Sequence, residues 1–161
     1  MQHSVRRIVT GHNEQGKAIF KSDTMQQMEN INNGEAWFAK LWTTDAMPAD
    51  CNDERDGALT PTGLSLANGT VLRMVDMPPG GRSPMHRTSS IDYGIVVQGE
   101  VHLELDDQQV VKLTQGDVVI QRGTIHAWEN KTNEFARMIF VLVDAKLFEV
   151  NGVPLQPAHH D

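Results

Sequence analysis

The sequence predicts an all-β protein, an antiparallel sandwich or barrel, and three observations lead to this fold class. From residue 70 onward, short apolar or alternating stretches follow one another at close, even spacing. Turn-forming sequences separate them, such as the PPGG at 78–81 and the QG at 98–99. Almost no stretch shows the helical period of about 3.6 residues. Short strands at this rhythm are typical of antiparallel sandwiches and barrels.

The predicted elements form one domain with three parts. The expected strands span residues 5–9, 17–21, 36–44, 70–77, 83–88, 93–99, 100–107, 109–116, 117–123, 124–130 and 134–145. Residues 1–65 form an N-terminal extension of extra strands, 66–145 the barrel, and 146–161 a C-terminal arm that we expect to be loose. The polar segment 23–35 reads as a loop, and 47–68, rich in Asp, Asn, Gly and Pro, as a long surface loop and a candidate lid.

Composition excludes several classes of partner. The 161 residues carry a formal net charge of -7, which argues against a nucleic-acid partner and against docking to an anionic membrane. The single cysteine, Cys51, excludes an internal disulfide framework. No apolar run approaches the length of a membrane span, and the N-terminal residues lack the apolar core of a signal peptide. We therefore expect a cytoplasmic protein.

The stretch MHRTSSIDYG at 85–94 places polar side chains at alternate positions. Alternate residues of an extended strand share one face. This spacing predicts that His86, Thr88, Ser90 and Asp92 all point the same way. A histidine, hydroxyls and a carboxylate on one face are candidates for metal binding or acid–base chemistry.

Two motifs resemble those of the cupin superfamily. The run from Gly81 through His86, Thr88 and Asp92 to Gly99 resembles the first motif, in which a glycine precedes a His-x-His pair, a Glu and a turn glycine. The run GDVVIQRGTIHAWEN at 116–130 resembles the second motif. The resemblance covers roughly residues 70–145 and implies a double-stranded β-helix, also called a jelly roll, of cupin type. It also implies a homodimer, with the extra N-terminal strands covering an exposed sheet edge of a neighbour.

The metal-binding positions of the motifs depart from the family pattern. His86 and His126 are retained, whereas Thr88 replaces the second histidine and Asp92 replaces the glutamate. Two imidazoles and one carboxylate are a set that holds a catalytic metal with open positions. The resemblance thus implies a divalent ion, Fe, Zn, Mn or Ni, bound by His86, Asp92 and His126.

The residues leave three functions open. The first is a metal-assisted enzyme on a small organic molecule, of dioxygenase, decarboxylase or isomerase type. The second is a metal-independent lyase or isomerase in which His126 and Asp92 move protons, with His86 as a third catalytic group. The third is a non-catalytic module that binds a small ligand, with the polar cluster serving structure alone. Fold analogy does not choose among them.

Further residues are candidates for contact with the substrate. Thr88 can hydrogen-bond a substrate oxygen, Gly94 can leave room for a ligand, and Trp128 shares a strand face with His126. Arg82 and Arg122 flank the two motifs and can grip a substrate carboxylate. Several methionines read as the lining of an apolar cavity, which favours a substrate with a hydrophobic body: Met74, Met77, Met85 and Met138.

Overall fold

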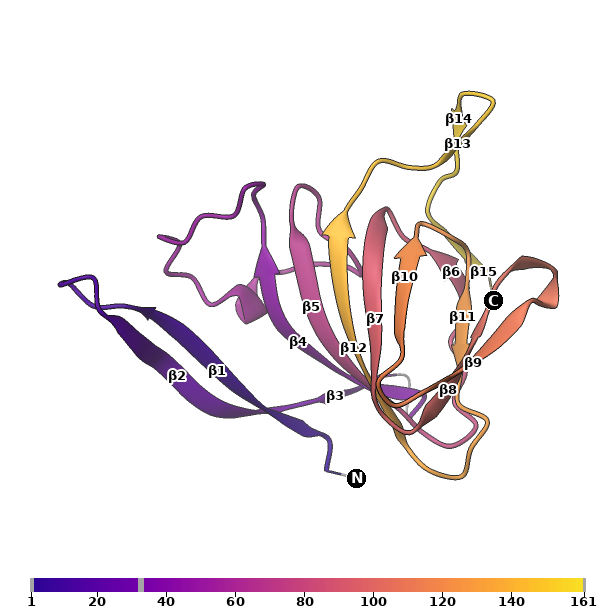
Figure 1. Ribbon diagram of the computed structural model, residues 1–161, viewed down its shortest axis with the longest axis horizontal. Helices are drawn as coiled ribbons and strands as arrows, with labels where there is room; N and C mark the ends of the chain where they lie inside the picture. Colours follow the sequence, from indigo (N-terminus) through magenta and orange to yellow (C-terminus); the bar gives the residue numbers. More distant parts are fainter. Residues whose placement is uncertain (1, 32–33, 161) are drawn as a thin grey trace.

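The computed structural model describes residues 2–31 and 34–160, and this part of the chain is almost entirely β-structure (Figure 1). Its strands are β1 (Ser4–His12), β2 (Ala18–Gln27), β3 (Glu29–Ile31), β4 (Ala36–Thr44), β5 (Thr70–Met77), β6 (Met85–Arg87), β7 (Ser90–Gln98), β8 (Glu100–Glu104), β9 (Val110–Thr114), β10 (Val118–Arg122), β11 (Ala127–Glu129), β12 (Ala136–Asp144), β13 (Glu149–Val150), β14 (Val153–Pro154) and β15 (Ala158–His160). Two 3-10 helices, η1 (Gly57–Leu59) and η2 (Asp106–Gln108), complete the described elements. The all-β prediction is confirmed.

Two antiparallel sheets build the barrel region. The larger has the strand order β10-β7-β12-β5-β4-β3, and the smaller has the order β11-β8-β9. β6 joins the smaller sheet through a bridge between His86 and His126, and a second bridge links Arg82 to Glu129. Figure 1 shows the large sheet curving toward the smaller one. This arrangement is the predicted double-stranded β-helix with extra N-terminal strands.

The main core lies between the two sheets. Strand alternation turns one side of each strand inward. The buried cluster consists of Val75, Met77, Val96, Val101, Leu103, Leu113, Trp128, Ala136 and Met138. Burial of each large apolar side chain contributes roughly 1.5–3 kcal/mol before chain entropy is subtracted. The same interior space holds the pocket described below.

A second, smaller core covers the outer side of β4 and β5. Met28, which precedes β3, packs there with Ala39, Leu41 and Met74. Met74 therefore belongs to this outer core, whereas Met77 lines the interior pocket. The N-terminal extension thus closes a face of the sheet that the barrel alone would leave open.

A buried ion-pair network fixes this extension to the barrel. Asp76 on β5 has no exposed surface, and Arg137 on β12 grips it with Nε and Nη2 at 2.5 and 2.7 Å. The ring of His3 lies 2.8 Å from the same carboxylate and stacks on Trp37 at 4.1 Å between ring centroids. Asp76 therefore joins three separate strands or segments of the chain.

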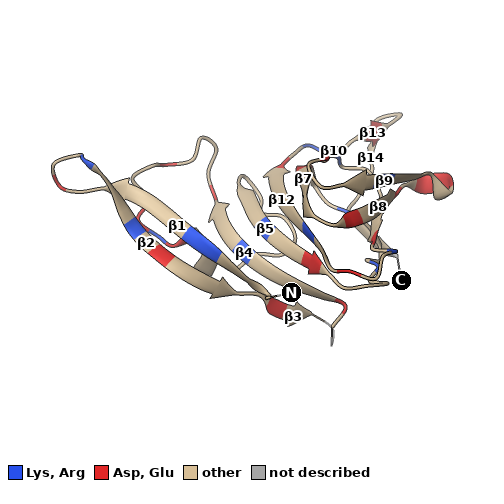
Figure 2. Ribbon diagram, turned by 60° about the horizontal axis from the view of Figure 1, so that its bottom comes forward, with Lys and Arg blue, Asp and Glu red and all other residues tan. Residues whose placement is uncertain are grey.

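The β1–β2 hairpin stands apart from both sheets (Figure 2). Its strands pair with each other, and an ion pair between Arg6 and Asp23 crosses its surface. Phe20 is 77% exposed and Met25 55% exposed, so the hairpin presents apolar side chains to solvent. The homodimer that would cover them stays a prediction.

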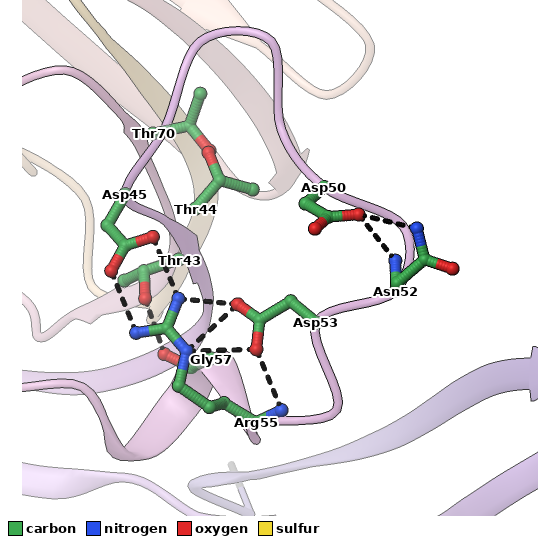
Figure 3. A network of polar contacts seen from close by, with 9 residues as sticks. All are labelled: Thr43, Thr44, Asp45, Asp50, Asn52, Asp53, Arg55, Gly57 and Thr70. Carbon is green, nitrogen blue, oxygen red and sulfur yellow. Dashed lines mark hydrogen bonds and ion pairs between the residues drawn. The ribbon is translucent and has the colours of Figure 1, made fainter.

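The loop at 47–68 is anchored to the end of β4 by polar contacts (Figure 3). The Arg55 guanidinium binds Asp45 and Asp53 with contacts of 2.8 and 2.5 Å, as Figure 3 shows. Thr43 donates a hydrogen bond of 2.7 Å to the Gly57 carbonyl. Leu64 reaches the interior pocket from this loop. The long surface loop is confirmed, and its role as a lid stays a prediction.

Two segments differ from the sequence-based expectation. Residues 23–35 are not simply a loop, because β2 continues to Gln27 and β3 follows it. These polar strands form through backbone pairing with β1 and β4. The sequence of the segment shows no apolar and polar alternation that would predict this pairing. The expectation of a loose C-terminal arm is wrong, since β15 pairs with β6 and places His159 opposite His86.

Within residues 2–31 and 34–160, no helix is both long and apolar enough to cross a bilayer.

Replacement of Arg137 by Met should destabilise the protein by roughly 3–5 kcal/mol, because it leaves the buried Asp76 carboxylate without its main partner. Chemical denaturation measures the change. The control is Arg6→Met, which breaks an exposed pair of the same two residue types and should change the stability much less, because water screens this pair. Equal losses from the two substitutions would show that the Asp76 network does not anchor the extension.

Candidate functional site

A pocket of about 190 Å³ opens into the interior between the two sheets. Its walls come from β3, β4, β5, β6, β7, β11 and β12, from Glu35 and Leu64, and from the segment that precedes β6. The lining residues are Ile31, Glu35, Ala36, Phe38, Leu64, Arg73, Val75, Met77, Arg82, Ser83, Pro84, His86, Thr88, Asp92, His126, Trp128, Phe140 and Leu142. More than half of these side chains are apolar or aromatic. The two histidines, Thr88 and Asp92 form one polar group, and Arg73 lies apart from it on β5. Such a lining suits a small organic molecule.

The two histidines lie side by side on antiparallel segments. The His86 backbone N–H donates to the His126 carbonyl at 2.9 Å, and His126 donates back at 3.0 Å. Their ring centroids are 4.2 Å apart. The sequence prediction that His126 joins His86 from the second motif is confirmed by this pairing.

Each ring uses Nδ1 for a local hydrogen bond. Nδ1 of His86 lies 2.9 Å from the Pro84 carbonyl, and Nδ1 of His126 lies 2.9 Å from the Thr124 carbonyl. A carbonyl only accepts, so Nδ1 must carry the proton and donate it. In the neutral ring this leaves a lone pair on Nε2. Both rings therefore present a proton acceptor away from their own backbone.

Burial keeps these imidazoles neutral. His126 is only 2% exposed, and burial together with the neighbouring His86 lowers its pKa to about 4. Burial also lowers the pKa of His86, while the Asp92 charge opposes that shift. At pH 7 both rings are neutral, so their Nε2 atoms are able to accept a proton.

Asp92 is a buried carboxyl held by hydroxyl groups. It is 5% exposed, and Ser90 Oγ donates to its Oδ1 at 2.5 Å. Thr88 Oγ1 lies 3.5 Å from Oδ2 and 2.8 Å from Ser90 Oγ. Burial raises the pKa of Asp92, and the Ser90 and Thr88 hydroxyls oppose this rise. The predicted shared face of Thr88, Ser90 and Asp92 is confirmed by their burial on one side of β7 and the turn before it.

Arg73 is a pocket residue that the sequence interpretation missed. It lies on β5, and its Nη2 donates to the Gly63 and Leu64 carbonyls at 3.0 and 3.3 Å. Its guanidinium carbon sits 5.6 Å from the centroid of the Phe38 ring. Burial lowers the pKa of Arg73, and the Asp92 charge partly offsets this effect. The available signal was a lone cation that alternates with the apolar residues Val75 and Met77 on one face of β5.

The other predicted contact residues have different positions. Trp128 lines the pocket, with its ring 6.2 Å from that of His126. Arg82 also lines it but is ion-paired to Glu104 and Glu129. Arg122 is exposed and lies outside this pocket.

The space beside Gly94 is filled by the protein itself. A Cβ placed on Gly94 would lie 3.1 Å from Cε1 of Phe140. Gly94 therefore makes room for the Phe140 ring, which lines the pocket in its place. Gly94 was expected to leave room for a ligand. It instead leaves room for Phe140, and Phe140 forms the wall of the pocket.

The side chains that could bind a metal ion in this pocket are those of His86, His126 and Asp92. The Nε2 lone pairs of His86 and His126, each backed by an Nδ1–H to a carbonyl, have the tautomer that metal-bound histidines use. However, among the described residues no group of three or more His, Cys, Asp or Glu is arranged to hold an ion. The Asp92 oxygens instead face Ser90 and Thr88. The predicted set of two histidines and Asp92 does not form a three-ligand site in this arrangement.

Fold and pocket define a class: a double-stranded β-helix with a polar cluster of histidines and a carboxyl in an apolar cavity. The sequence pattern of the cupin domain matches residues 73–142. The chain is 37% identical to the cupin-domain-containing oxidoreductase virC of Hypocrea virens, over 95% of this chain and 82% of that protein. The chain belongs to the cupin family.

Two further likenesses are informative. The chain is 39% identical to phomopsin biosynthesis cluster protein C' of Diaporthe leptostromiformis, over 91% of this chain and 82% of that protein. Its fold is similar to that of the polyketide cyclase RemF from Streptomyces resistomycificus, with a TM-score of 0.50 and 20% identity. This match covers 71% of this chain and 72% of that one. The second likeness concerns the fold.

Acidification should destabilise the protein through His126. Its pKa is about 4 in the folded protein and about 6.5 when exposed, so the unfolded chain binds the proton first as the pH falls. Stability is thus retained above pH 6.5 and lost between about 6.5 and 4. At pH 4.5 the loss through this residue is roughly 2–3 kcal/mol relative to pH 7.

Urea denaturation of the wild type and of His126→Gln at both pH values measures this loss. The variant should lose correspondingly less stability on acidification. Asp92 is present in both proteins, so its own contribution to the pH dependence cancels when the two are compared. A His102→Gln control, which changes a histidine outside the pocket, should retain the wild-type pH dependence. The same pH dependence in wild type and His126→Gln would contradict a neutral, buried His126.

Proposed function

We propose that this chain is an enzyme of small-molecule biosynthesis that transfers protons on a hydrophobic substrate, as a metal-independent lyase or isomerase. The observation that carries this proposal is the pairing of neutral imidazoles with a buried carboxyl in one apolar pocket. The environment moves the pKa of His126 and that of Asp92 in opposite directions from their usual values. Such opposed shifts in one cavity are typical of acid–base assignments.

The proposed step uses His126 as the base and Asp92 as the acid. Nε2 of His126 takes a proton from a substrate carbon next to a carbonyl. Burial favours the protonated form of Asp92, and in this form Asp92 gives its proton to the carbonyl oxygen, which produces an enol. In a β,γ-unsaturated carbonyl substrate, His126 then gives its proton to the γ-carbon while Asp92 takes back the enol proton, which shifts the double bond and restores both side chains. In an elimination, Asp92 instead protonates a departing β-hydroxyl, which leaves as water while a carbon–carbon double bond forms.

Electrostatics favour the coupling of these two transfers. A lone imidazolium is unfavourable in this cavity, as the lowered pKa of His126 shows. When Asp92 loses its proton in the same step, the resulting carboxylate attracts the new imidazolium, and the two charges stabilise each other. His86 places a second neutral acceptor beside His126 and can receive the proton from it.

Relatives support a role in biosynthesis. One is named as a protein of the phomopsin biosynthesis cluster, and another carries the name of the oryzines biosynthesis cluster of Aspergillus oryzae. Others are named oxidoreductases. The expected substrate is accordingly a small metabolite, and the apolar lining of the pocket agrees with one that has a hydrophobic body.

A second candidate is metal-assisted oxidation. The Nε2 lone pairs of His86 and His126 favour it, as does the oxidoreductase name of several relatives. A bound Fe, Zn, Mn or Ni ion would supply Lewis-acid or redox chemistry, with these two histidines as its protein ligands. Further ligands would have to come from water, the substrate or a rearranged Asp92.

Proton exchange tests the first candidate without knowledge of the natural substrate. Phenylacetone, 1-tetralone and 3-phenylpropanal are incubated with the protein in D₂O, and mass spectrometry follows deuterium uptake next to the carbonyl. The wild type should accelerate uptake for at least one probe. Asp92→Asn and His126→Gln should each lower the enzymatic rate by about 100-fold, the usual size of a general acid or base contribution.

His102→Gln is the matched control and should exchange at the wild-type rate. Equal exchange in wild type, Asp92→Asn and His126→Gln would contradict the proton-transfer proposal. Repeating the assay after dialysis against a chelator, and again with Zn²⁺ or Fe²⁺ added, separates the two candidates. Activity that disappears with the chelator and returns with the ion would support the metal-assisted one.

A further inference from the structure

The pocket contains a cation that no ion pair neutralises. Within the described part of the chain, Arg73 forms no ion pair with a carboxylate, whereas Arg82, in the same lining, contacts Glu104 and Glu129. The partners of Arg73 are the carbonyls of Gly63 and Leu64, which carry no net charge. A guanidinium in a partly dry site without a counter-ion is unfavourable unless another group supplies one.

The Arg73 guanidinium also has N–H groups that donate no hydrogen bond to a described residue. Both carbonyl contacts come from Nη2, and neither Nε nor Nη1 donates to a described residue. The planar arrangement of Nε–H and Nη–H groups matches the two oxygens of a carboxylate. Contact with the Phe38 ring and with the loop carbonyls holds the group in place, so little side-chain entropy remains to be lost on binding.

Among residues 2–31 and 34–160, no carboxylate forms an ion pair with the Arg73 guanidinium. In its ionised form Asp92 attracts Arg73 across the cavity, but the Asp92 oxygens are engaged by Ser90 and Thr88. On β12, Phe140 lies opposite Arg73 and Leu142 lies opposite Asp92, and both apolar side chains line the pocket.

We propose that Arg73 is the anion-binding residue of the pocket and that the ligand is a small hydrophobic carboxylate, bound with its carboxylate on the Arg73 guanidinium. The apolar body of the ligand fills the space against Val75 and Phe140. Its far end then reaches His126 and Asp92. The reacting position of that ligand rests on the proposed function, whereas the carboxylate site at Arg73 does not.

An isosteric pair of probes tests this site by binding alone. Calorimetric titration at pH 7.5 compares 3-phenylpropionate with 3-phenylpropionamide, which have the same shape and differ in charge. The wild type should bind the carboxylate about tenfold or more tightly than the amide, as expected for a charge-assisted hydrogen-bonded pair. In Arg73→Gln the two affinities should come within about twofold of each other, with the amide affinity unchanged.

Arg73→Lys retains a positive charge without the planar fork and should keep part of the preference. Arg87→Gln is the matched control, because Arg87 also donates to a backbone carbonyl and lies outside the pocket lining. Retained amide binding shows that a variant is folded. If Arg73→Gln loses its fold, the wild-type comparison and Arg73→Lys decide the question.

Three results would overturn the assignment: no preference for the carboxylate in the wild type, a preference that survives in Arg73→Gln, or an equal loss in Arg87→Gln. Failure of the deuterium exchange assay with the carboxylate preference intact would refute the proton-transfer proposal alone. Loss of the preference with exchange intact would refute the role of Arg73 alone.

Discussion

The inward and outward alternation of β7 within the large sheet is the constraint on which the pocket depends. β7 pairs with β10 on one side and β12 on the other, so its backbone donors and acceptors are satisfied and its register is fixed. Ser90, Asp92 and Gly94 then face the interior, while Tyr93 is exposed. A shift of one residue would exchange the two faces and remove the carboxyl from the cavity. The pairing of β7 with its two neighbours therefore determines that the Asp92 carboxyl lies in the pocket.

Two buried aspartates in this sheet, Asp76 and Asp92, have different surroundings and therefore different roles. Asp76 accepts two hydrogen bonds from Arg137 and lies beside His3, so its charge is compensated and its role is to join segments of the chain. Asp92 has hydroxyl partners and no ion pair among the described residues, and burial raises its pKa. In the proposed reaction, Asp92 is the carboxyl that exchanges a proton with the ligand.

The same burial links stability to the proposed activity. The pocket keeps the imidazoles neutral because they are buried, and this burial comes from the aromatic and aliphatic walls that form part of the core. Trp128 illustrates the point, since it belongs to the main core and also contacts the His126 ring edge-on. Substitutions that loosen this wall would raise the pKa of His126 and weaken its character as a neutral base at low pH.

Local patterns predicted much of the fold and the centre of the site. The alternation of 85–94 predicted the shared face of Thr88, Ser90 and Asp92, and the order of the two motifs predicted that His126 would meet His86. Arg73 was missed because its strand reads as core, and sequence alternation does not tell which side of a sheet curves around a cavity.

Other features depend on contacts between distant parts of the chain, which the local sequence does not encode. The pairing of β15 with β6 joins residues far apart in the sequence, and so does the ion pair of Asp76 with Arg137. The role of Gly94 also required the position of Phe140 on the neighbouring strand. The local sequence also does not encode the positions of the Asp92 oxygens, on which the prediction of a metal site depended.

The protonation state of the two histidines tests the central claim most directly. Long-range nitrogen–proton correlation NMR on histidine-labelled protein at pH 7 reports which ring nitrogens of His86 and His126 carry protons. His86→Gln and His126→Gln assign the signals. The account predicts two neutral rings, each with its proton on Nδ1 and a free lone pair on Nε2. An imidazolium, or a neutral ring with its proton on Nε2, would contradict it.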